Sequence, residues 1–314
     1  MNYTLRKIHL KDTQADIETD RSTYIGCSDI GTIMGVNPWK SAYTLWAEKT
    51  GRIIPDDISD KPAVWWGHEE EHLVAKWFML KTGIKVKRSN YRYYLEEMPY
   101  FSGHVDRLLA DKSAGLEIKT TSARSKTDYA EGDIPDSHYW QCQGYMCLTG
   151  LSEWYIATKQ DQTVHIGLVR RNDEDIDRML TAVSNFWQCV QDDIPPRTDG
   201  SESTTRTLDT IYTPSVPEKT YLSESDDIAL TQLANFKERM KHLKGEISAL
   251  ENEIKEKMGE CELAESEGYI VTWKSYTADR FDSKRFKEDH PDLYEEYTNT
   301  SVSRRFNVKE RNKK

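Results

Sequence analysis

The 314-residue sequence lacks several features that mark common protein classes. It has no apolar run of the roughly 18 to 20 residues that a membrane-spanning helix needs. Its opening stretch, MNYTLRKIHLKD, has no apolar core of a secretory signal. No G-x-x-x-x-G-K-[ST] loop is present, so nothing indicates a nucleotide-driven motor. We therefore expect a cytoplasmic protein that contacts no membrane.

Cysteine is scarce: there are five, and no two of them form a C-x-x-C pair. The close spacing that an iron-sulfur cluster requires is absent, so we expect no such cluster. No local signature of a catalytic cysteine surrounds any of the five. Reduced, unpaired thiols are the expectation, as in a cytosolic protein.

Excess positive charge is also missing, since 53 acidic residues outnumber 43 basic ones and the net charge is -10. Phosphate attraction dominates non-specific DNA affinity, so this balance argues against a general nucleic-acid binder. A local basic channel remains compatible with it. Its candidate lining residues are Lys85, Lys87, Arg88, Arg124 and Lys126. Trp39, Trp65 and Trp66 are candidates for stacking on bases, although we expect core packing for at least two of the three.

The most informative stretch is FSGHVDRLLADKSAGLEIKTT, residues 101–121. Side chains alternate across a strand, so Glu117 and Lys119 share one face of a predicted strand while Leu116 and Ile118 take the other. Asp106 lies in a preceding predicted strand, residues 101–109, and the polar residues 111–115 supply the turn signals of a hairpin. Pairing across that turn is expected to bring Asp106 close to Glu117.

Two neighbouring carboxylates repel each other unless a cation offsets their charge, and oxygen ligands suit Mg²⁺ or Mn²⁺. Lys119 beside them would orient a water or stabilise charge on a phosphoryl oxygen. For the isolated triplet, an exposed hairpin with scattered charges is the competing interpretation.

Length and patterning predict one full domain with a smaller extension. Strands are predicted at 154–158 and 164–169, and an amphipathic helix at 173–191, which Pro195 and Pro196 follow. We place the first domain at residues 1–196. Residues 197–220, rich in Ser, Thr and Pro, are predicted as a linker without regular structure.

Residues 221–314 form the predicted C-terminal extension. It begins with a long helix whose apolar residues repeat in steps of three and four, a narrow seam suited to a coiled coil, to packing within the chain, or to docking of a partner. A strand at 269–273, helical turns at 282–297 and a strand-like basic tail at 303–309 follow. The tail is either solvated or in contact with DNA. The seam residues are Leu233, Phe236, Met240, Leu243, Ile247, Leu250 and Ile254.

A zinc site is a weaker alternative. His68-Glu69-Glu70-Glu71-His72 fits the H-E-x-x-H pattern literally, with Glu69 as the base. A third ligand would have to come from His104, His138 or His165, none of which has a recognisable spacing. Another amphipathic helix, residues 67–81, carries this string, with an inward stripe of Leu73, Val74, Trp77, Phe78 and Leu80.

Four motifs in order make the chain resemble the YqaJ-type viral recombinases, relatives of phage lambda exonuclease. GCSDIGTIMGVNPWKSAYTLWAEKTG, residues 26–51, is similar to their opening motif. WGHEEEHLVA, residues 66–75, resembles their G-x-x-x-E helix. The D…E-x-K triplet of residues 106–119 follows. YWQCQGYM, residues 139–146, resembles their late Q-x-Q-x-x-M helix, and a similar Leu-Thr-Gly comes after it.

The resemblance implies a PD-(D/E)xK nuclease of α/β (α+β) class, with a restriction-endonuclease-like core in which helices flank a central mixed sheet. His104 stands where the proline that names the superfamily is expected, but that proline shapes a turn and carries no chemistry. By resemblance, Asp106, Glu117, the Ile118 carbonyl and Glu71 would hold metal, and Lys119 would place the attacking water. Gln143 would orient the site, with Gln141 as the alternative, and Arg21 and Ser28 would bind a terminal 5'-phosphate.

The resemblance also implies a function: an Mg²⁺-dependent 5'-to-3' exonuclease that degrades linear double-stranded DNA to 5'-mononucleotides and exposes a 3' single strand for phage-type recombination. Its implied partners are DNA ends, a single-strand annealing recombinase, and further copies of itself in a ring such as a trimer. A phage or prophage protein of this kind would act in the cytoplasm of a bacterial host. An endonuclease or repair nuclease with the same site, and a non-cutting DNA-end-binding adaptor, are the alternatives.

Overall fold

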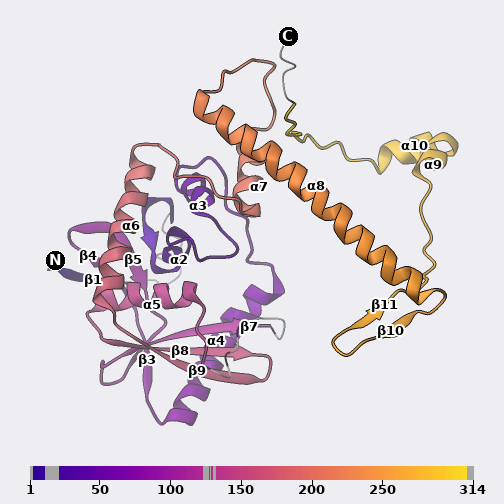
Figure 1. Cartoon of the computed structure of the whole chain (residues 1–314). Coiled ribbons are helices and arrows are strands. Elements are labelled where there is room, and N and C mark those ends of the chain that lie inside the picture. The colour runs from indigo at the N-terminus through magenta and orange to yellow at the C-terminus, as the bar shows by residue number, and fades with distance from the viewer. Residues whose placement is uncertain (1–2, 11–20, 123–126, 128, 130–131, 310–314) are drawn as a thin grey trace. The chain divides into compact units, whose positions relative to one another are not determined.

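The structure is a computed structural model of the whole chain, and it describes residues 3–10, 21–122, 127, 129 and 132–309. The chain divides into two compact units, Met1–Tyr212 and Thr213–Lys314 (Figure 1). The first unit holds nearly all of the buried residues.

A five-stranded mixed sheet carries the D…E-x-K triplet. Its order is β3 (Val86–Arg88), β6 (Arg107–Leu109), β7 (Gly115–Thr121), β8 (Glu153–Gln160) and β9 (Thr163–Arg170). The β6–β7 hairpin is antiparallel, as the turn signals predict, and β7 and β8 are parallel because α5 (Asp136–Thr149) connects them. The structure has two strands where the sequence predicts a single one over residues 101–109. The first, β5 (Met98–His104), is separated by two residues from β6, which begins at Arg107.

The second sheet has four strands in the order β1 (Leu5–His9), β4 (Tyr91–Leu95), β5 (Met98–His104) and β2 (Ile25–Gly26). Only β2 and β5 are parallel in it. The short elements η1 (Arg21–Thr23), η2 (Cys27–Asp29) and α2 (Ile30–Ile33) surround β2. The opening motif therefore lies beside β5, which leads directly to Asp106.

Helices cover the five-stranded sheet, which confirms the predicted α/β class. The helix α4 (Pro62–Thr82) packs Val74, Ala75 and Phe78 against Leu116, Ile118 and Ala157. Leu116 and Ile118 thus point to the core, as strand alternation predicts. The expected inward stripe of α4 is too wide, because only one narrow line of the helix meets the sheet: Leu73, Trp77 and Leu80 are exposed.

The remaining helices of the first unit are α3 (Ala42–Lys49), α6 (Asp173–Gln191) and α7 (Glu202–Ile211). The bounds of α6 are those predicted from its periodicity, and its inward residues are buried with the main core. The structure corrects the expectation of an irregular stretch at 197–220, since α7 lies within it. Its buried side chains Ser203, Thr204 and Thr207 are polar and bond to Ser41 and Thr44 of the α3 region, while its apolar residues Leu208 and Ile211 are partly buried against the core.

The second unit is built on α8 (Glu224–Met258), followed by the hairpin of β10 (Leu263–Glu265) and β11 (Ile270–Thr272). Two short helices, α9 (Ser283–Asp289) and α10 (Pro291–Glu296), occupy the region of predicted helical turns. Residues 303–309 are not a strand, contrary to the prediction, since no neighbouring strand offers them a ladder of hydrogen bonds among the described residues. No helix of the described chain is long and apolar enough to cross a membrane.

Candidate active site

The register of the β6–β7 hairpin brings Asp106 to Glu117. Arg107 pairs with Leu116, and Asp106 immediately precedes Arg107 while Glu117 immediately follows Leu116. Asp106 Oδ2 accepts a hydrogen bond from the Ile118 backbone N–H at 2.9 Å. The carboxylate of Asp106 is therefore anchored against the strand that carries Glu117 and Lys119, as the hairpin predicts.

Glu117, Lys119 and Gln141 form a closed group of side chains. Lys119 Nζ lies 2.6 Å from Glu117 Oε1 and donates to Gln141 Oε1 at 3.0 Å. Gln141 Nε2 donates to the same Glu117 oxygen at 2.9 Å. Each member of the group thus contacts the other two, which fixes the rotamers of all three.

Burial sets the electrostatics of this group. Glu117 is only 3% exposed. Burial, followed by repulsion from Glu117, raises the pKa of Asp106 well above its usual range. Burial acts to lower the pKa of Lys119, but the adjacent Glu117 carboxylate outweighs it and the pKa is raised. A proton or a cation is therefore strongly favoured between the two carboxylates, and Lys119 stays charged.

The two glutamines of α5 point to different places, because residues two apart on a helix lie on different sides. Gln141 points to Glu117 and Lys119. Gln143, fully buried, donates from Nε2 to the Arg170 carbonyl at 2.8 Å and accepts from Asn172 N–H at 3.0 Å. Gln141, the alternative left open by the sequence, is thus the glutamine that contacts Glu117 and Lys119.

Glu71 does not join the carboxylates as a free ligand. Its Oε1 lies 2.6 Å from Arg107 Nη1, and the same nitrogen donates to the Asp106 carbonyl at 2.8 Å. Glu71 is still close enough to contribute to the raised pKa of Asp106. Arg107 therefore ties the α4 acid to the start of β6, and Glu71 lies at the margin of the site.

Arg21 and Ser28 lie together, as the family resemblance implies. Arg21 Nη2 donates to Ser28 Oγ at 3.1 Å. Both residues line a cavity of about 260 Å³ with Ser102 and Gly103 of β5 and Tyr145 of α5. The cavity has a cationic wall and several hydroxyl groups, a composition suited to a phosphate.

Tyr145 connects this cavity to the carboxylates. Its hydroxyl accepts a hydrogen bond from Gln141 Nε2 at 2.7 Å, the same nitrogen that bonds to Glu117. Burial and the nearby Glu117 raise the pKa of Tyr145 well above its usual range, so the hydroxyl stays protonated. The hydroxyl therefore keeps a proton that it can donate.

A buried lysine holds the Arg21–Ser28 segment in place. Lys49 of α3 is 8% exposed, and its ammonium contacts the carbonyls of Arg21 at 2.5 Å and Tyr24 at 2.6 Å and the Asp29 carboxylate at 3.2 Å. Three acceptors match the three N–H groups of the ammonium. Asp29 also accepts from Gly26 N–H at 3.0 Å, which closes the loop around Ser28.

The carboxylate oxygens of Glu117 and Asp106 fit a divalent cation. Glu117 Oε2 is buried and has no hydrogen-bond partner among the described residues, a costly state for a carboxylate oxygen. A cation beside it would relieve that cost, and Asp106 supplies a second hard ligand. No group of three His, Cys, Asp or Glu side chains in the described chain is arranged to hold a metal, consistent with the engagement of Glu71 by Arg107. Asp106 and Glu117 therefore fit a divalent cation, and Glu71 stays a predicted further ligand.

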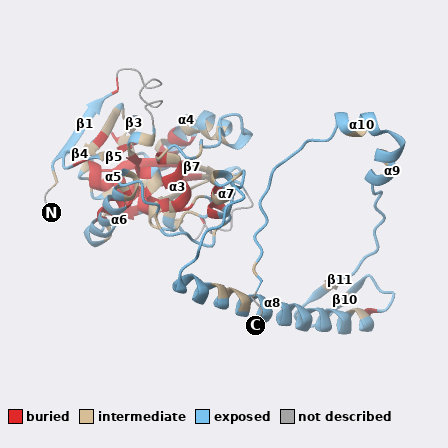
Figure 2. Cartoon of the chain, turned by 90° about the horizontal axis from the view of Figure 1, so that it is seen from above, coloured by how far each residue is buried: buried red, intermediate tan, exposed pale blue. Residues whose placement is uncertain are grey.

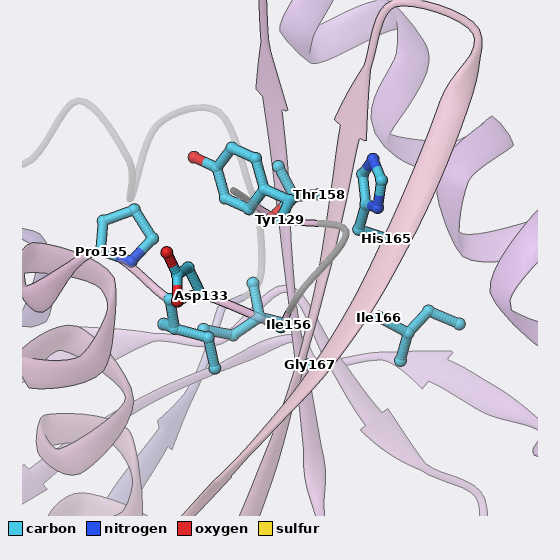
Figure 3. A pocket seen from close by; sticks show the side chains of 10 residues that line it. Tyr129, Asp133, Pro135, Ile156, Thr158, His165, Ile166 and Gly167 are labelled. Atoms are coloured by element: carbon cyan, nitrogen blue, oxygen red, sulfur yellow. The ribbon is translucent and has the colours of Figure 1, made fainter. Parts of the chain in front are cut away.

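The zinc alternative finds no support. His68 and His72 are exposed on α4. His165 faces the ring of Tyr129 in a cavity of about 10 Å³, where the two ring centroids are 6.1 Å apart (Figure 3). That space holds no more than a water.

The structure gives the positions of the three tryptophans and of three of the five basic residues considered for DNA contact. Trp39, Trp65 and Trp66 are all exposed, contrary to the expectation that at least two pack in the core. Lys85, Lys87 and Arg88 are exposed at or beside the edge strand β3, while Arg124 and Lys126 lie outside the described residues.

Sequence reasoning missed Arg107, Tyr145 and Lys49. Tyr145 was within reach, because it lies four residues after Gln141 on one helix face. Arg107 directly follows Asp106, but a strand neighbour normally points to the other face. Lys49 gave no signal, since its partners are backbone carbonyls more than twenty residues away.

A mixed sheet with helices on it, whose paired strands gather two carboxylates and a lysine, is the arrangement of the PD-(D/E)xK class. Residues 17–152 match the YqaJ-like viral recombinase domain family. The chain is 31% identical to the uncharacterized protein YqaJ of Bacillus subtilis (strain 168) over 296 residues. The aligned region covers 93% of this chain and 92% of that protein. The chain belongs to this family.

Two solved structures are similar at lower identity. One is an alkaline exonuclease from Laribacter hongkongensis, with a TM-score of 0.46 and 19% identity, covering 55% of this chain and 91% of that one. The other is a phage-related exonuclease from Haemophilus somnus 129PT, with a TM-score of 0.46 and 16% identity, covering 55% of this chain and 95% of that one.

Proposed function

We propose that this protein is a metal-dependent 5'-to-3' exonuclease that digests linear double-stranded DNA and leaves a 3' single strand for recombination. One observation carries the proposal: Glu117 is buried with an unpartnered oxygen beside Asp106, and Lys119 and Gln141 are locked onto its other oxygen. Burying these charged groups costs folding free energy, and their arrangement is suited to phosphodiester hydrolysis.

Asp106 and Glu117 would hold Mg²⁺ or Mn²⁺, with the Ile118 carbonyl completing the protein ligands. When bound there, the ion supplies positive charge that polarises the scissile phosphodiester and favours ionisation of water. Lys119 remains a cation, and its Nζ is positioned by Glu117 and Gln141 to orient the attacking water. Glu71, which pairs with Arg107 at the margin of the site, would help to bind the metal.

The cavity beside Arg21 and Ser28 would bind the terminal 5'-phosphate of the strand being digested. Arg21 provides charge and a directional donor, and Ser28 provides a hydroxyl. Tyr145 links this cavity to the carboxylates through Gln141. A site that holds the end of a strand next to the cleavage centre favours release of 5'-mononucleotides from that end.

The family relationship supports further proposals about partners. We propose that DNA ends are the substrate, that a ring of copies such as a trimer encloses the DNA, and that a single-strand annealing recombinase receives the 3' strand. Exposed Trp39, Trp65 and Trp66 are candidates for stacking on opened bases.

The test compares a linear duplex with a covalently closed circle of the same sequence, in Mg²⁺ and in EDTA. We expect loss of the linear duplex only, in Mg²⁺ only, with 5'-labelled mononucleotide appearing before 3'-labelled product. Cleavage of the circle would instead indicate an endonuclease. Tight binding of ends without loss of label would indicate a DNA-end adaptor.

A further inference from the structure

The longest helix of the chain presents an apolar seam that its own unit leaves open. Along α8, Phe236, Met240, Leu243, Ile247, Leu250 and Ile254 are each between 42% and 64% exposed. Figure 2 shows most of this helix as exposed. The alternating steps of three and four place these side chains at the a and d positions of heptads, with Met240, Ile247 and Ile254 at a. A seam of this kind is covered by another helix in a coiled coil.

Charge along the seam is divided in halves. At the flanking e and g positions, the first half of the seam carries Lys237, Arg239 and Lys244, and the second half carries Glu246, Glu251 and Glu253. Charges at the e and g positions determine which helix pairs with α8 and whether the two helices run parallel or antiparallel.

We propose that α8 pairs with α8 of a second copy of this chain in an antiparallel coiled coil. A two-fold axis near Gly245 brings the basic half of each helix against the acidic half of the other. In this register Met240 lies opposite Leu250 of the second copy, Leu243 opposite Ile247, and Phe236 opposite Ile254. The apolar layers therefore match from Phe236 to Ile254, and Leu233 at the end of the seam lies opposite Lys257.

The same register pairs the flanking charges. Lys237 faces Glu251 of the second copy and Arg239 faces its Glu253, and the two-fold axis repeats both pairs. At the axis Lys244 faces Lys244 of the second copy and Glu246 faces its Glu246, which makes two like-charge contacts against the four opposite-charge pairs. A parallel pair instead sets each g residue against the next e residue of its partner, which joins Arg239 to Lys244 and Glu246 to Glu251. Those like-charge contacts disfavour the parallel arrangement.

Ion pairs within the helix do not prevent this assembly. Glu251 lies 3.3 Å from Lys255 and Glu253 lies 2.6 Å from Lys257, in exposed contacts one turn apart. Exposed pairs of this type contribute little to stability, so the glutamates remain available to a second copy. Lys237 also lies over the ring of Phe306, 5.9 Å from its centroid, yet Phe236 beside it stays 61% exposed.

Charge exchange in the full-length chain tests the proposal. An acidic-helix variant carries Lys237→Glu, Arg239→Glu and Lys244→Glu, and a basic-helix variant carries Glu246→Lys, Glu251→Lys and Glu253→Lys. By sedimentation velocity, each variant alone should have half the assembly mass of the wild type, whatever further assembly the first unit makes. An equimolar mixture of the two should recover the wild-type mass. Circular dichroism checks that α8 stays helical.

A control variant with Lys241→Glu and Glu256→Lys, at outward positions, should keep the wild-type mass. Wild-type mass in both single-type variants, or failure of their mixture to recover it, would overturn the proposal, as would a wild type that shows no doubling. Direction is read separately from spin labels at Ser225→Cys in a Cys261→Ser background. A rise of 1.5 Å per residue puts the two labels roughly 60 Å apart in the antiparallel pair. A separation near 20 Å or less, on the order of two helix diameters, would contradict it.

Discussion

The side-chain amide of Gln141 donates to Glu117 Oε1 at 2.9 Å, and its carbonyl oxygen accepts from Lys119 at 3.0 Å. The amide therefore bonds to both members of the Glu117–Lys119 ion pair and helps to orient the carboxylate and the ammonium. Gln143, two residues later, bonds to the carbonyl of Arg170 at the end of β9 and to the N–H of Asn172.

Replacing these glutamines one at a time should separate catalysis from stability. Gln141→Ala removes a positioned group from the reaction centre, and we expect a loss of about 10²- to 10³-fold in the single-turnover rate with a nearly normal melting temperature. Gln143→Ala leaves the Arg170 carbonyl and the Asn172 N–H without their hydrogen-bond partner, which lowers the free energy of unfolding by about 1 to 3 kcal/mol. Its rate per folded molecule should stay near wild type. The reverse pattern would return the site role to Gln143.

Divalent metal should stabilise the folded protein through Glu117. With Mn²⁺ at a hundredfold excess over its dissociation constant, the free energy of unfolding should rise by about 2.7 kcal/mol. Glu117→Gln keeps the shape but removes the charge, and we expect the Mn²⁺-dependent shift in melting temperature to disappear. Glu153→Gln, at the start of β8, is the matched control and should leave the shift intact. A full shift in Glu117→Gln would show that the ion binds elsewhere.

Lys49 should control recognition of the DNA end without touching it. In Lys49→Met the Asp29 carboxylate loses its buried counter-ion, and Arg21, whose Nη2 already lies 3.7 Å from it, becomes the nearest cation. We expect the preference for 5'-phosphate over 5'-hydroxyl ends, measured by duplex binding in Ca²⁺, to fall at least about tenfold, the equivalent of ~1.4 kcal/mol.

The double variant Lys49→Met, Asp29→Asn removes the unpaired charge and should recover most of that preference. Lys40→Met, at a more exposed lysine that pairs with Glu48, serves as the control and should change nothing. A wild type with no preference between the two ends would count against the phosphate cavity itself. Equal loss with both ends would mean that Lys49 has only a structural role.

Acid should destabilise the first unit through His138. This residue lies in the first turn of α5, its Nδ1 is buried without a partner in the described part of the chain, and burial, with a smaller effect of Lys119, lowers its pKa to about 4. The unfolded chain binds a proton near pH 6.5 and the folded one does not. Stability is therefore complete above about pH 6.5 and falls as pH drops toward 4, by at most about 1.4 kcal/mol per pH unit.

Urea unfolding at a series of pH values measures that slope. His138→Gln should flatten it between pH 6.5 and 4, whereas His242→Gln, on the exposed surface of α8, should not. An unchanged slope in His138→Gln would assign the acid sensitivity to other groups.

The sequence predicts well what depends on local periodicity. Strand alternation placed Leu116 and Ile118 in the core and Glu117 and Lys119 opposite them, and the turn signals placed Asp106 across the hairpin. The bounds of α6 followed from its apolar period and from Asn172, whose side chain caps its first turn. In these elements the pattern and the tertiary environment agree.

Long-range polar contacts were out of reach of that reasoning. The helix α7 contacts α3 through hydroxyl groups, and two apolar residues, Leu208 and Ile211, are too few to predict a helix from the sequence. The choice between Gln141 and Gln143 depends on the rotation of α5 about its axis, which the close approach of Gly144 to Ile30 and Cys27 helps to fix. Lys49 holds the opening motif through hydrogen bonds to the backbone carbonyls of Arg21 and Tyr24. Every residue has such a carbonyl, so the sequence gives no sign of these contacts.

The most direct test of the central claim is the single-turnover digestion of a 5'-phosphorylated linear duplex by wild type and Lys119→Ala in saturating Mg²⁺. Lys119 contacts both Glu117 and Gln141, so its removal should slow mononucleotide release by about 10²- to 10⁴-fold while duplex binding persists. Digestion by Lys119→Ala at the wild-type rate would show that the reaction centre lies elsewhere.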